Sequence, residues 1–311
     1  MNNKSLNKIP LKASCIALSF LFLLSACGGS ASPNSASSSA QTVSTAKIKI
    51  TAAENFYGEA AKAVGGDRVE VTSVLNNPSV DPHDYEPTPD VARTVSNSKI
   101  IVLNGVGYDE WMEKLVNADP ASKSKSVIKV ADDVMGKKAG DNPHVWYDPE
   151  TMPKLANKIA DELTKLDPSG DQNFHKNAQA YITSLDSIKA KIQKLKQSGA
   201  KIAVSETIFD YMAAAMNLTI NNTKFGKAIN DGNDPSPADI AQMQEDIKSK
   251  AVKLFVYDIQ NTSPTVDNIV KMAKSSGVPI VEVTETEPEG KNYVKWMTDI
   301  LDNIGKALGI Q

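Results

Sequence analysis

The sequence predicts an α/β protein of two lobes, each a parallel sheet flanked by helices, joined by one long rigid helix. Two observations support this prediction. Strand-like and helix-like segments alternate before residue 170 and again after residue 199, which is typical of βαβ units with a parallel sheet covered on both faces. An apolar stripe with helical spacing separates the two regions. We therefore expect an N-terminal lobe over 47–170, a linking helix over 171–198 and a C-terminal lobe over 199–311.

The first 46 residues predict an export signal followed by a tether. Three lysines precede an apolar run at 13–24, which is shorter than the about 20 residues that span a bilayer, so 1–26 is interpreted as a signal peptide. The Leu-Ser-Ala-Cys sequence ending at Cys27 resembles the bacterial lipobox, in which the cysteine is lipidated; the alternative is a plain cleavable signal. Residues 27–46 are nearly all small or polar, which predicts a flexible tether.

Composition excludes several classes of protein. The formal net charge of -3 lacks the basic balance of a nucleic-acid binder, so we expect no nucleic-acid partner. Two cysteines cannot form a disulfide framework or a four-thiolate metal site. No second apolar run approaches membrane length, so we expect a soluble body held on the extracytoplasmic face of the cell membrane by the lipid at Cys27.

The N-terminal lobe is predicted from short buried strands that alternate with helices. The strands are expected at 48–53, 69–71, 100–103 and 127–128. The helices are expected at 58–64, 89–96, 108–116 and 150–166. Thr88-Pro89 and Pro149-Glu150 are typical helix starts, because proline is tolerated in the first turn.

The linking helix is predicted from one apolar stripe. Its members are spaced alternately by four and three residues: Phe174, Ala178, Tyr181, Leu185, Ile188, Ile192 and Leu195. Asp171 is a suitable N-cap and Gly199 a suitable stop, which gives a helix about 40 Å long at 1.5 Å per residue. Such a helix could run the height of a domain. The alternative is a coiled-coil interaction helix.

The alternation resumes in the C-terminal lobe. Strands are expected at 201–205, 254–257 and 279–284, and helices at 208–216, 237–250, 264–275 and 293–308. Ser236 is a suitable N-cap for the second of these helices, and Gly277 follows the third as a stop signal. The second lobe therefore has the same α/β character as the first.

The chain has only three histidines, and two of them have similar surroundings. His83 and His144 each follow a proline, whose fixed φ stiffens the backbone, and each lies in a loop leading into a helix. Rigid presentation suits a metal ligand. The alternative is two loop histidines with ordinary hydrogen bonds. His175 lies beside the apolar stripe next to Lys176, and we expect it to be solvated.

Carboxylates occupy matching positions in the second lobe. Glu206 follows the strand at 201–205, and Glu285 follows the strand at 279–284. Ligands of open α/β sheets bind beyond the carboxyl ends of the strands, so these acids could meet the two histidines across a crevice. Two imidazoles and two carboxylates suit a divalent first-row ion. Asp258, which follows the strand at 254–257, competes for the fourth place.

Three segments resemble signature segments of the zinc/manganese solute-binding proteins of ABC importers. They are His-Asp-Tyr-Glu-Pro-Thr-Pro-Asp at 83–90, Asn-Pro-His-Val-Trp-Tyr-Asp-Pro at 142–149 and Ser-Glu-Thr-Ile-Phe at 205–209. The resemblance covers roughly 47–311 and keeps the order of the motifs. It implies two α/β lobes bridged by a long helix, with a four-residue metal site between the lobes.

The resemblance also assigns the ligands by position. His83 and His144 match the two histidine ligands, and Glu206 lies where members carry Glu or His. Glu285 lies where many members have Asp, so its side chain is one methylene longer. The His-rich acidic loop of many zinc members is missing, which disfavours a dedicated zinc scavenger without excluding zinc.

The resemblance implies a monomeric lipid-anchored receptor, not an enzyme, that captures one Mn²⁺ or Zn²⁺ ion as cargo and delivers it to the permease of an ABC importer. One alternative is a metal-dependent hydrolase with His83, His144 and Glu206 as its three ligands, although the sequence has no His-Glu-x-x-His helix and no nucleophile elbow. Another is a surface adhesion lipoprotein, which the anchor and tether would also suit. A receptor for an organic solute would leave the paired histidines unexplained.

Overall fold

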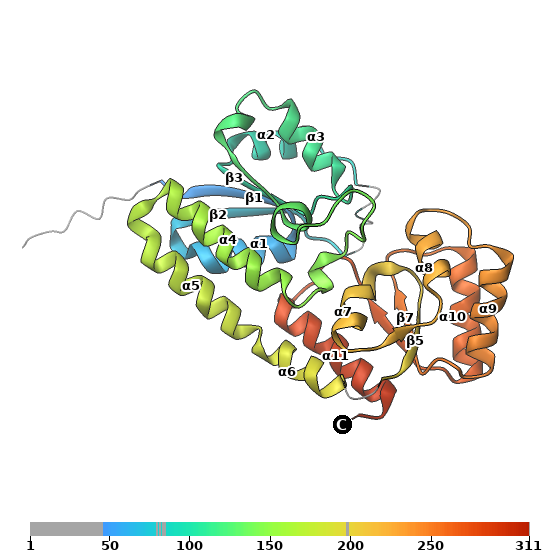
Figure 1. Ribbon diagram of the computed structural model, residues 1–311. Helices are drawn as coiled ribbons and strands as arrows, with labels where there is room; N and C mark the ends of the chain where they lie inside the picture. The colour runs from blue at the N-terminus through green and yellow to red at the C-terminus, as the bar shows by residue number, and fades with distance from the viewer. Residues whose placement is uncertain (1–45, 79, 81, 83–84, 197–198, 311) are drawn as a thin grey trace, which may run out of the picture. The chain divides into compact units, whose positions relative to one another are not determined.

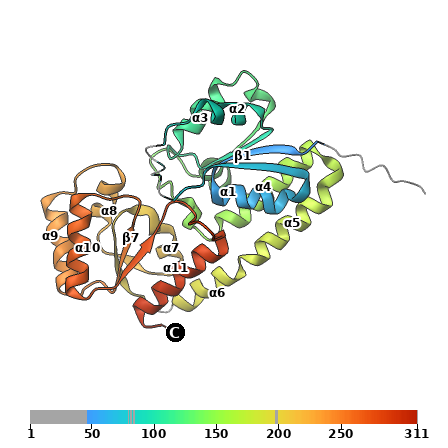
Figure 2. The same cartoon turned by 180° about the vertical axis from the view of Figure 1, so that it is seen from behind.

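Two parallel sheets and their covering helices build the part of the chain that the structure describes (Figures 1 and 2). The computed structural model describes residues 46–78, 80, 82, 85–196 and 199–310. The strands are β1 (Ile48–Glu54), β2 (Val69–Leu75), β3 (Ile100–Leu103), β4 (Ser126–Lys129), β5 (Lys201–Val204), β6 (Thr219–Ile220), β7 (Phe255–Asp258) and β8 (Ile280–Val283).

The α-helices of the first half are α1 (Asn55–Gly65), α2 (Pro89–Asn97), α3 (Glu110–Ala118), α4 (Thr151–Leu166), α5 (Asp171–Ser184) and α6 (Asp186–Leu195). Those of the second half are α7 (Asp210–Ala215), α8 (Thr223–Asn230), α9 (Pro237–Lys248), α10 (Pro264–Ser276) and α11 (Tyr293–Leu308). Short 3-10 helices cover Gly66–Arg68, Ser122–Ser124, Val145–Tyr147, Pro168–Gly170 and Thr207–Phe209, and Val130–Val134 forms a π-helical turn.

The two sheets have equivalent strand orders, β2-β1-β3-β4 and β6-β5-β7-β8, and every neighbouring pair is parallel. The predicted α/β class with two parallel sheets is confirmed. In the N-terminal sheet, α2 and α3 lie on one face and α1 and α4 on the other (Figure 1). In this order the chain reverses direction across the sheet at β1 and at β5, and ligands of such sheets bind beyond the carboxyl ends at that point.

The predicted long helix is present in two segments, α5 and α6, separated by Leu185. The amide of Leu185 donates to the carbonyl of Ile182 at 3.1 Å, a spacing of three residues that tightens the turn. All seven members of the predicted stripe are buried in the main hydrophobic cluster. Because α5 packs on α1 and α4 while α6 packs on α11, the stripe is used inside the chain and does not support the coiled-coil alternative.

Most other elements lie where the sequence predicts them, but β6, α8, the turn Val130–Val134 and several short 3-10 helices have no counterpart in the prediction. The strand β6 has only two residues, too few for a periodic pattern to predict it. The helix expected at 208–216 is split into the 3-10 turn Thr207–Phe209 and α7.

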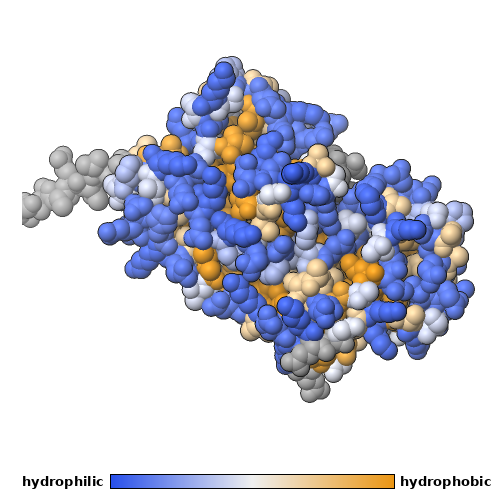
Figure 3. Space-filling model, viewed as in Figure 1, coloured by the Kyte–Doolittle hydropathy of each residue, from blue (hydrophilic) through white to orange (hydrophobic). Residues whose placement is uncertain are grey.

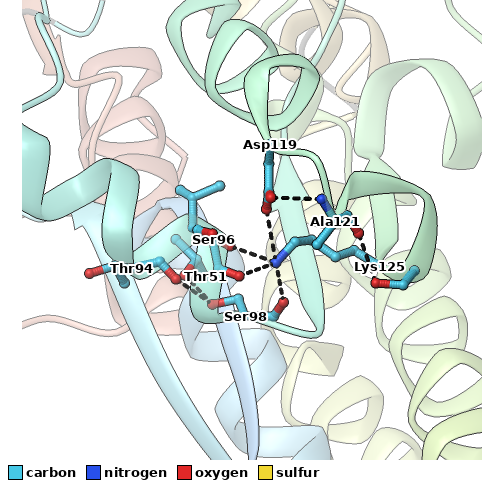
Figure 4. Close-up of polar contacts among 9 residues, drawn as sticks. Thr51, Thr94, Ser96, Ser98, Asp119, Ala121 and Lys125 are labelled. Atoms are coloured by element: carbon cyan, nitrogen blue, oxygen red, sulfur yellow. Dashed lines mark hydrogen bonds and ion pairs between the residues drawn. The ribbon is translucent and has the colours of Figure 1, made fainter.

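The side chain of a buried lysine, Lys125, caps the C-terminal end of α2 (Figure 4). The ammonium group of Lys125 donates to the carbonyls of Val95 at 3.1 Å and Ser98 at 2.7 Å, and also to that of Ser96. The carboxylate of Asp119 lies 3.2 Å from the same nitrogen, and both side chains are almost completely buried. The last carbonyls of a helix lack partners within the helix, so a cation at this position satisfies them. The amide of Ala121 and then the ammonium of Lys125 lower the pKa of Asp119.

The surface is far more hydrophilic than the interior between the sheets and their helices. On the face drawn in Figure 3, hydrophilic residues predominate and the apolar patches between them are small. No helix in the described part of the chain is long and apolar enough to cross a membrane. The segments predicted to be signal peptide, lipidated cysteine and tether lie outside the described residues, except for Ala46.

Candidate metal centre

The acids singled out by the sequence lie at the carboxyl ends of neighbouring strands. Glu206 lies two residues beyond β5, Asp258 is the last residue of β7, and Glu285 lies two residues beyond β8. Each is at most 1% exposed. Parallel neighbours end at the same edge of a sheet, so the strand order β5-β7-β8 gathers the three carboxyl groups.

His144 joins these acids from the other half of the chain. It immediately precedes the 3-10 helix Val145–Tyr147 and is fully buried. One ligand atom each from His144, Glu206 and Glu285 lie within 4.8 Å of one another. The structure thus brings together three of the four predicted ligands. The fourth, His83, lies outside the described residues.

The imidazole of His144 is oriented by Asn142. Nδ1 of the ring lies 2.9 Å from Oδ1 of Asn142, and the backbone amide of His144 donates to the same oxygen at 3.0 Å. An amide oxygen only accepts, so Nδ1 carries the proton and Nε2 is the ring nitrogen that could bind a metal. Asn142 is itself held, because its Nδ2 donates to the carbonyl of Thr207 at 2.7 Å and its carbonyl accepts from the Tyr211 hydroxyl at 2.7 Å.

The carboxylates of Glu206 and Glu285 each accept a hydrogen bond from a side chain. The Tyr108 hydroxyl donates to Oε2 of Glu285 at 2.7 Å. Nδ2 of Asn261 donates to Oε2 of Glu206, also at 2.7 Å. These bonds fix the two carboxylates, as outer partners do around metal ligands. Neither donor was predicted, because each is distant in sequence from the carboxylate it contacts.

The loop that carries Tyr108 has an unusual backbone. Gly105, Val106 and Gly107 have φ angles of 85°, 51° and 83°, and the left-handed region is uncommon for a β-branched residue such as Val106. The Asp109 carboxylate stabilises this turn by accepting hydrogen bonds from the backbone amides of Asn104 at 2.6 Å and Gly105 at 2.8 Å. Burial raises the pKa of Asp109 to about 6. Strained turns of this kind occur at functional sites.

Asp258, the alternative fourth ligand, lies beside the three clustered residues. Its Oδ1 accepts the amide of Gln260 at 3.0 Å, and its own amide donates to the Ser205 hydroxyl at 2.9 Å. Burial, followed by the negative charges of Glu206 and Glu285, raises the pKa of Asp258 well above its ordinary value. Of the two alternatives, Glu285 is the one in the group whose ligand atoms converge.

Aromatic rings line the histidine side of the centre. The ring of Trp146 lies 5.2 Å from that of His144 and 5.0 Å from that of Tyr108, measured between centroids. Trp146 is fully buried. An apolar shell of this kind limits the access of water to a metal and fixes the orientation of its ligands.

No other group of three or more His, Cys, Asp or Glu side chains converges in this way within the described ranges. His175, the remaining histidine, has a half-exposed side chain near Asp171 and Asp161, as expected for a solvated position. An imidazole with several buried carboxyl groups is a donor set for a divalent first-row cation, whose charge would offset that of the acids.

Known proteins resemble this chain over most of its length. Residues 50–307 match the family model described as zinc-uptake complex component A, periplasmic. The chain is 27% identical to the iron ABC transporter substrate-binding lipoprotein MtsA of Streptococcus pyogenes, over 96% of this chain and 98% of that protein. It is 26% identical to the manganese ABC transporter substrate-binding lipoprotein PsaA of Streptococcus pneumoniae, over 88% and 93% of the two chains.

Solved structures share the fold. The substrate-binding protein FpvC of Pseudomonas aeruginosa, in complex with Mn²⁺, matches with a TM-score of 0.70 at 23% identity, covering 85% of this chain and 98% of that one. The periplasmic zinc-binding protein TroA of Treponema pallidum matches with a TM-score of 0.68 at 21% identity, covering 84% and 99%. Because the family model spans most of the sequence, the chain belongs to the family of zinc-uptake complex component A proteins.

Proposed function

We propose that this chain is the substrate-binding protein of an ABC importer, which captures one divalent transition-metal ion, Mn²⁺ or Zn²⁺, and delivers it to the permease. The observation that carries the proposal is the convergence of His144 with Glu206 and Glu285 at a buried point between two α/β lobes. Membership of the family and the substrate-binding names of the relatives support the same function.

The proposed ligands are His83, His144, Glu206 and Glu285. The position of His83 after Pro82, in the motif that it shares with the family, supports its assignment. Asp258 is proposed to stay outside the ligand set as a neighbouring acid. Binding would displace protons from the imidazoles and draw the four groups around the ion. Affinity alone cannot select Mn²⁺, since Zn²⁺ outbinds it at most N/O sites.

The protein is proposed to work at the outer face of the cell membrane. The lipobox-like sequence supports a lipid anchor at Cys27, and relatives are named as lipoproteins. The partner would be the membrane permease, and we propose that the receptor is a monomer. We also propose that it is not an enzyme, because the described groups around the centre hold ligands in place and the family is a transporter component.

Metal content and calorimetry test the proposal. Chelator-stripped protein would be titrated with Mn²⁺ and with Zn²⁺, and the metal retained after purification would be measured by mass spectrometry. We expect one saturable site per chain that is lost in His83→Ala and in His144→Ala. His175→Ala is the matched control, because that side chain is half-exposed and distant in sequence from the motifs. The absence of saturable binding of either ion would refute the proposal.

The fourth ligand is tested in the same titration. Glu285→Ala should abolish tight binding, whereas Asp258→Asn, which keeps the shape of the side chain, should retain a saturable site. The reverse pattern would assign the fourth position to Asp258.

A further inference from the structure

We propose that Asn55 and Gln260 are positioning residues that hold the backbone segment 285–287 from both lobes, so that retention of the metal at Glu285 depends on the contact between the lobes. This inference rests on the proposed function. Neither residue belongs to the converging group of ligands. Their side-chain amides instead bond to the backbone of Glu287 and of Glu285, respectively.

The need for such support comes from the end of β8. The strand ends at Val283, and the next four residues, 284–287, are buried although they belong to no ladder. Buried amides and carbonyls require hydrogen-bond partners. Here several of these partners are side chains, including the Tyr147 hydroxyl, which donates to the carbonyl of Thr284 at 2.9 Å.

Gln260 supports this segment from its own lobe. Its Oε1 accepts the amide of Glu285 at 2.8 Å and the amide of Thr286 at 3.2 Å. The backbone amide of Gln260 donates to Oδ1 of Asp258, which places the side chain beside the end of β7. One amide oxygen therefore fixes two successive peptide groups, the first of which belongs to the proposed ligand.

Asn55 supports the same segment from the other lobe. It is the first residue of α1, and its Nδ2 donates to the carbonyl of Glu287 at 2.9 Å. Its Oδ1 accepts the amide of Glu287 at 3.2 Å and that of Phe56 at 3.1 Å. Asn55 thus pairs with both the backbone amide and the backbone carbonyl of Glu287, which lies two positions beyond Glu285.

Gln260 also reaches across to the N-terminal lobe. Its Nε2 donates to the carbonyl of Val80 at 3.1 Å. Val80 precedes the proposed ligand His83 by three residues in the sequence. A single side chain therefore connects the backbone of Glu285 with the segment leading to the histidine motif. Parting of the lobes would break this bond and the Asn55 bonds together, and would release the peptide groups that position Glu285.

Metal-release kinetics test the inference. The variants are Gln260→Met, which keeps the length of the side chain without its hydrogen bonds, and Asn55→Ala. The bound Mn²⁺ or Zn²⁺ would be removed by excess chelator in a stopped-flow experiment. Since loss of outer partners typically costs 10- to 100-fold in metal affinity, we expect release to be faster by about tenfold in each variant, with little change in the association rate.

Two matched controls remove similar bonds elsewhere. Gln242→Met removes a bond from Nε2 to Oδ1 of Asp246 on α9. Asn177→Ala removes a bond from Nδ2 to the carbonyl of Val64, between α5 and α1. Release from both controls should match that from the unaltered protein. The thermal midpoint of each metal-free variant would also be measured, because a purely structural role would lower this midpoint along with the affinity.

Several outcomes would overturn the inference. These are unchanged release from both Gln260→Met and Asn55→Ala, equally fast release from the controls, or faster release that appears only together with a matching loss of metal-free stability. If the unaltered protein itself bound neither ion, the proposed function would fail before this comparison began, so the two failures are distinguishable.

Discussion

Two buried polar clusters in this protein are built in opposite ways. Around Lys125, the chain supplies a cation, the carboxylate of Asp119 and backbone carbonyls in a closed arrangement. Around His144, it supplies an imidazole and several carboxyl groups, and burial, followed by the negative charges of Glu206 and Glu285, raises the pKa of Asp258. Burying a charge is costly unless an opposite charge accompanies it. The comparison indicates that the first cluster stabilises the fold, whereas the proposed function assigns to the second cluster a cation that binds from outside.

Removal of the internal cation should have the largest effect on stability. In Lys125→Met, Asp119 and the end of α2 would lose their partner, and breaking a buried pair is strongly destabilising. We expect the thermal midpoint of the metal-free protein to fall by about 10 °C, while affinity for the metal changes by less than about twofold. Calorimetric scans and titrations of the refolded variant measure both quantities. A large loss of affinity with intact stability would contradict the contrast between the clusters.

Removal of a carboxylate from the proposed metal centre should instead lower metal affinity without lowering the stability of the metal-free protein. Glu285→Gln keeps the size of the side chain but removes a negative charge that acts on Asp258. We expect metal affinity to fall by about 100-fold or more, with a metal-free thermal midpoint equal to or higher than that of the unaltered protein. The matched control is Glu282→Gln on β8, an exposed position that should change neither quantity. A lower metal-free midpoint for Glu285→Gln would show that this acid stabilises the fold.

The amino-acid sequence predicts the acids and the histidine of this second cluster well, because each is recognisable from its immediate neighbours in the sequence. Acids that follow strands are gathered by the parallel sheet, and a histidine after a proline is recognisable from its neighbours. The long stripe likewise predicts a buried helical face. It does not predict the break at Leu185, where the backbone stays in the right-handed region and the apolar spacing continues.

The supporting contacts could not be predicted in the same way. Tyr108 and Glu285 are 177 residues apart, and Gln260 and Val80 are 180 apart, so no periodicity connects them. The contact between Asn142 and the His144 ring could have been predicted, since Asn142 lies two residues before His144 in the motif at 142–149. An asparagine so close to a proposed metal-binding histidine is a suitable partner for Nδ1.

Disturbing that partner should have a smaller effect than removing a ligand. In Asn142→Ala the imidazole would lose the acceptor that fixes its tautomer, and affinity should fall by about 20-fold. Asn230→Ala is a suitable control, because its Oδ1 accepts from the Thr207 hydroxyl in the same region of the fold. Calorimetric titrations with Zn²⁺ at neutral pH measure the metal affinity of both variants. An unchanged affinity for Asn142→Ala would mean that the ring of His144 is oriented by its aromatic neighbours.

The smallest expected effect is a dependence of stability on pH, with opposite signs in two buried regions. The pKa of Asp109 is raised by burial to about 6, so the folded protein holds this proton at pH values where the unfolded chain has released it. The unfolding free energy contributed by Asp109 is therefore fully present below about pH 4 and is lost as the pH rises through about 6. For Asp119, whose pKa is lowered, the contribution is present above its ordinary pKa and is lost as the pH falls below it.

Denaturant titrations of the metal-free protein between about pH 2 and about pH 7 would resolve these signs, because the Asp119 contribution is lost only below about pH 4. Asp109→Asn should flatten the decline between about pH 4 and pH 6, and Asp119→Asn should leave that decline in place. A decline unaffected by Asp109→Asn would assign it to other buried acids, such as Glu54 beside Asp109, whose pKa is also raised by burial. The N-terminal lobe would then contain both kinds of buried acid, one that folding keeps ionised beside Lys125 and one that folding keeps protonated.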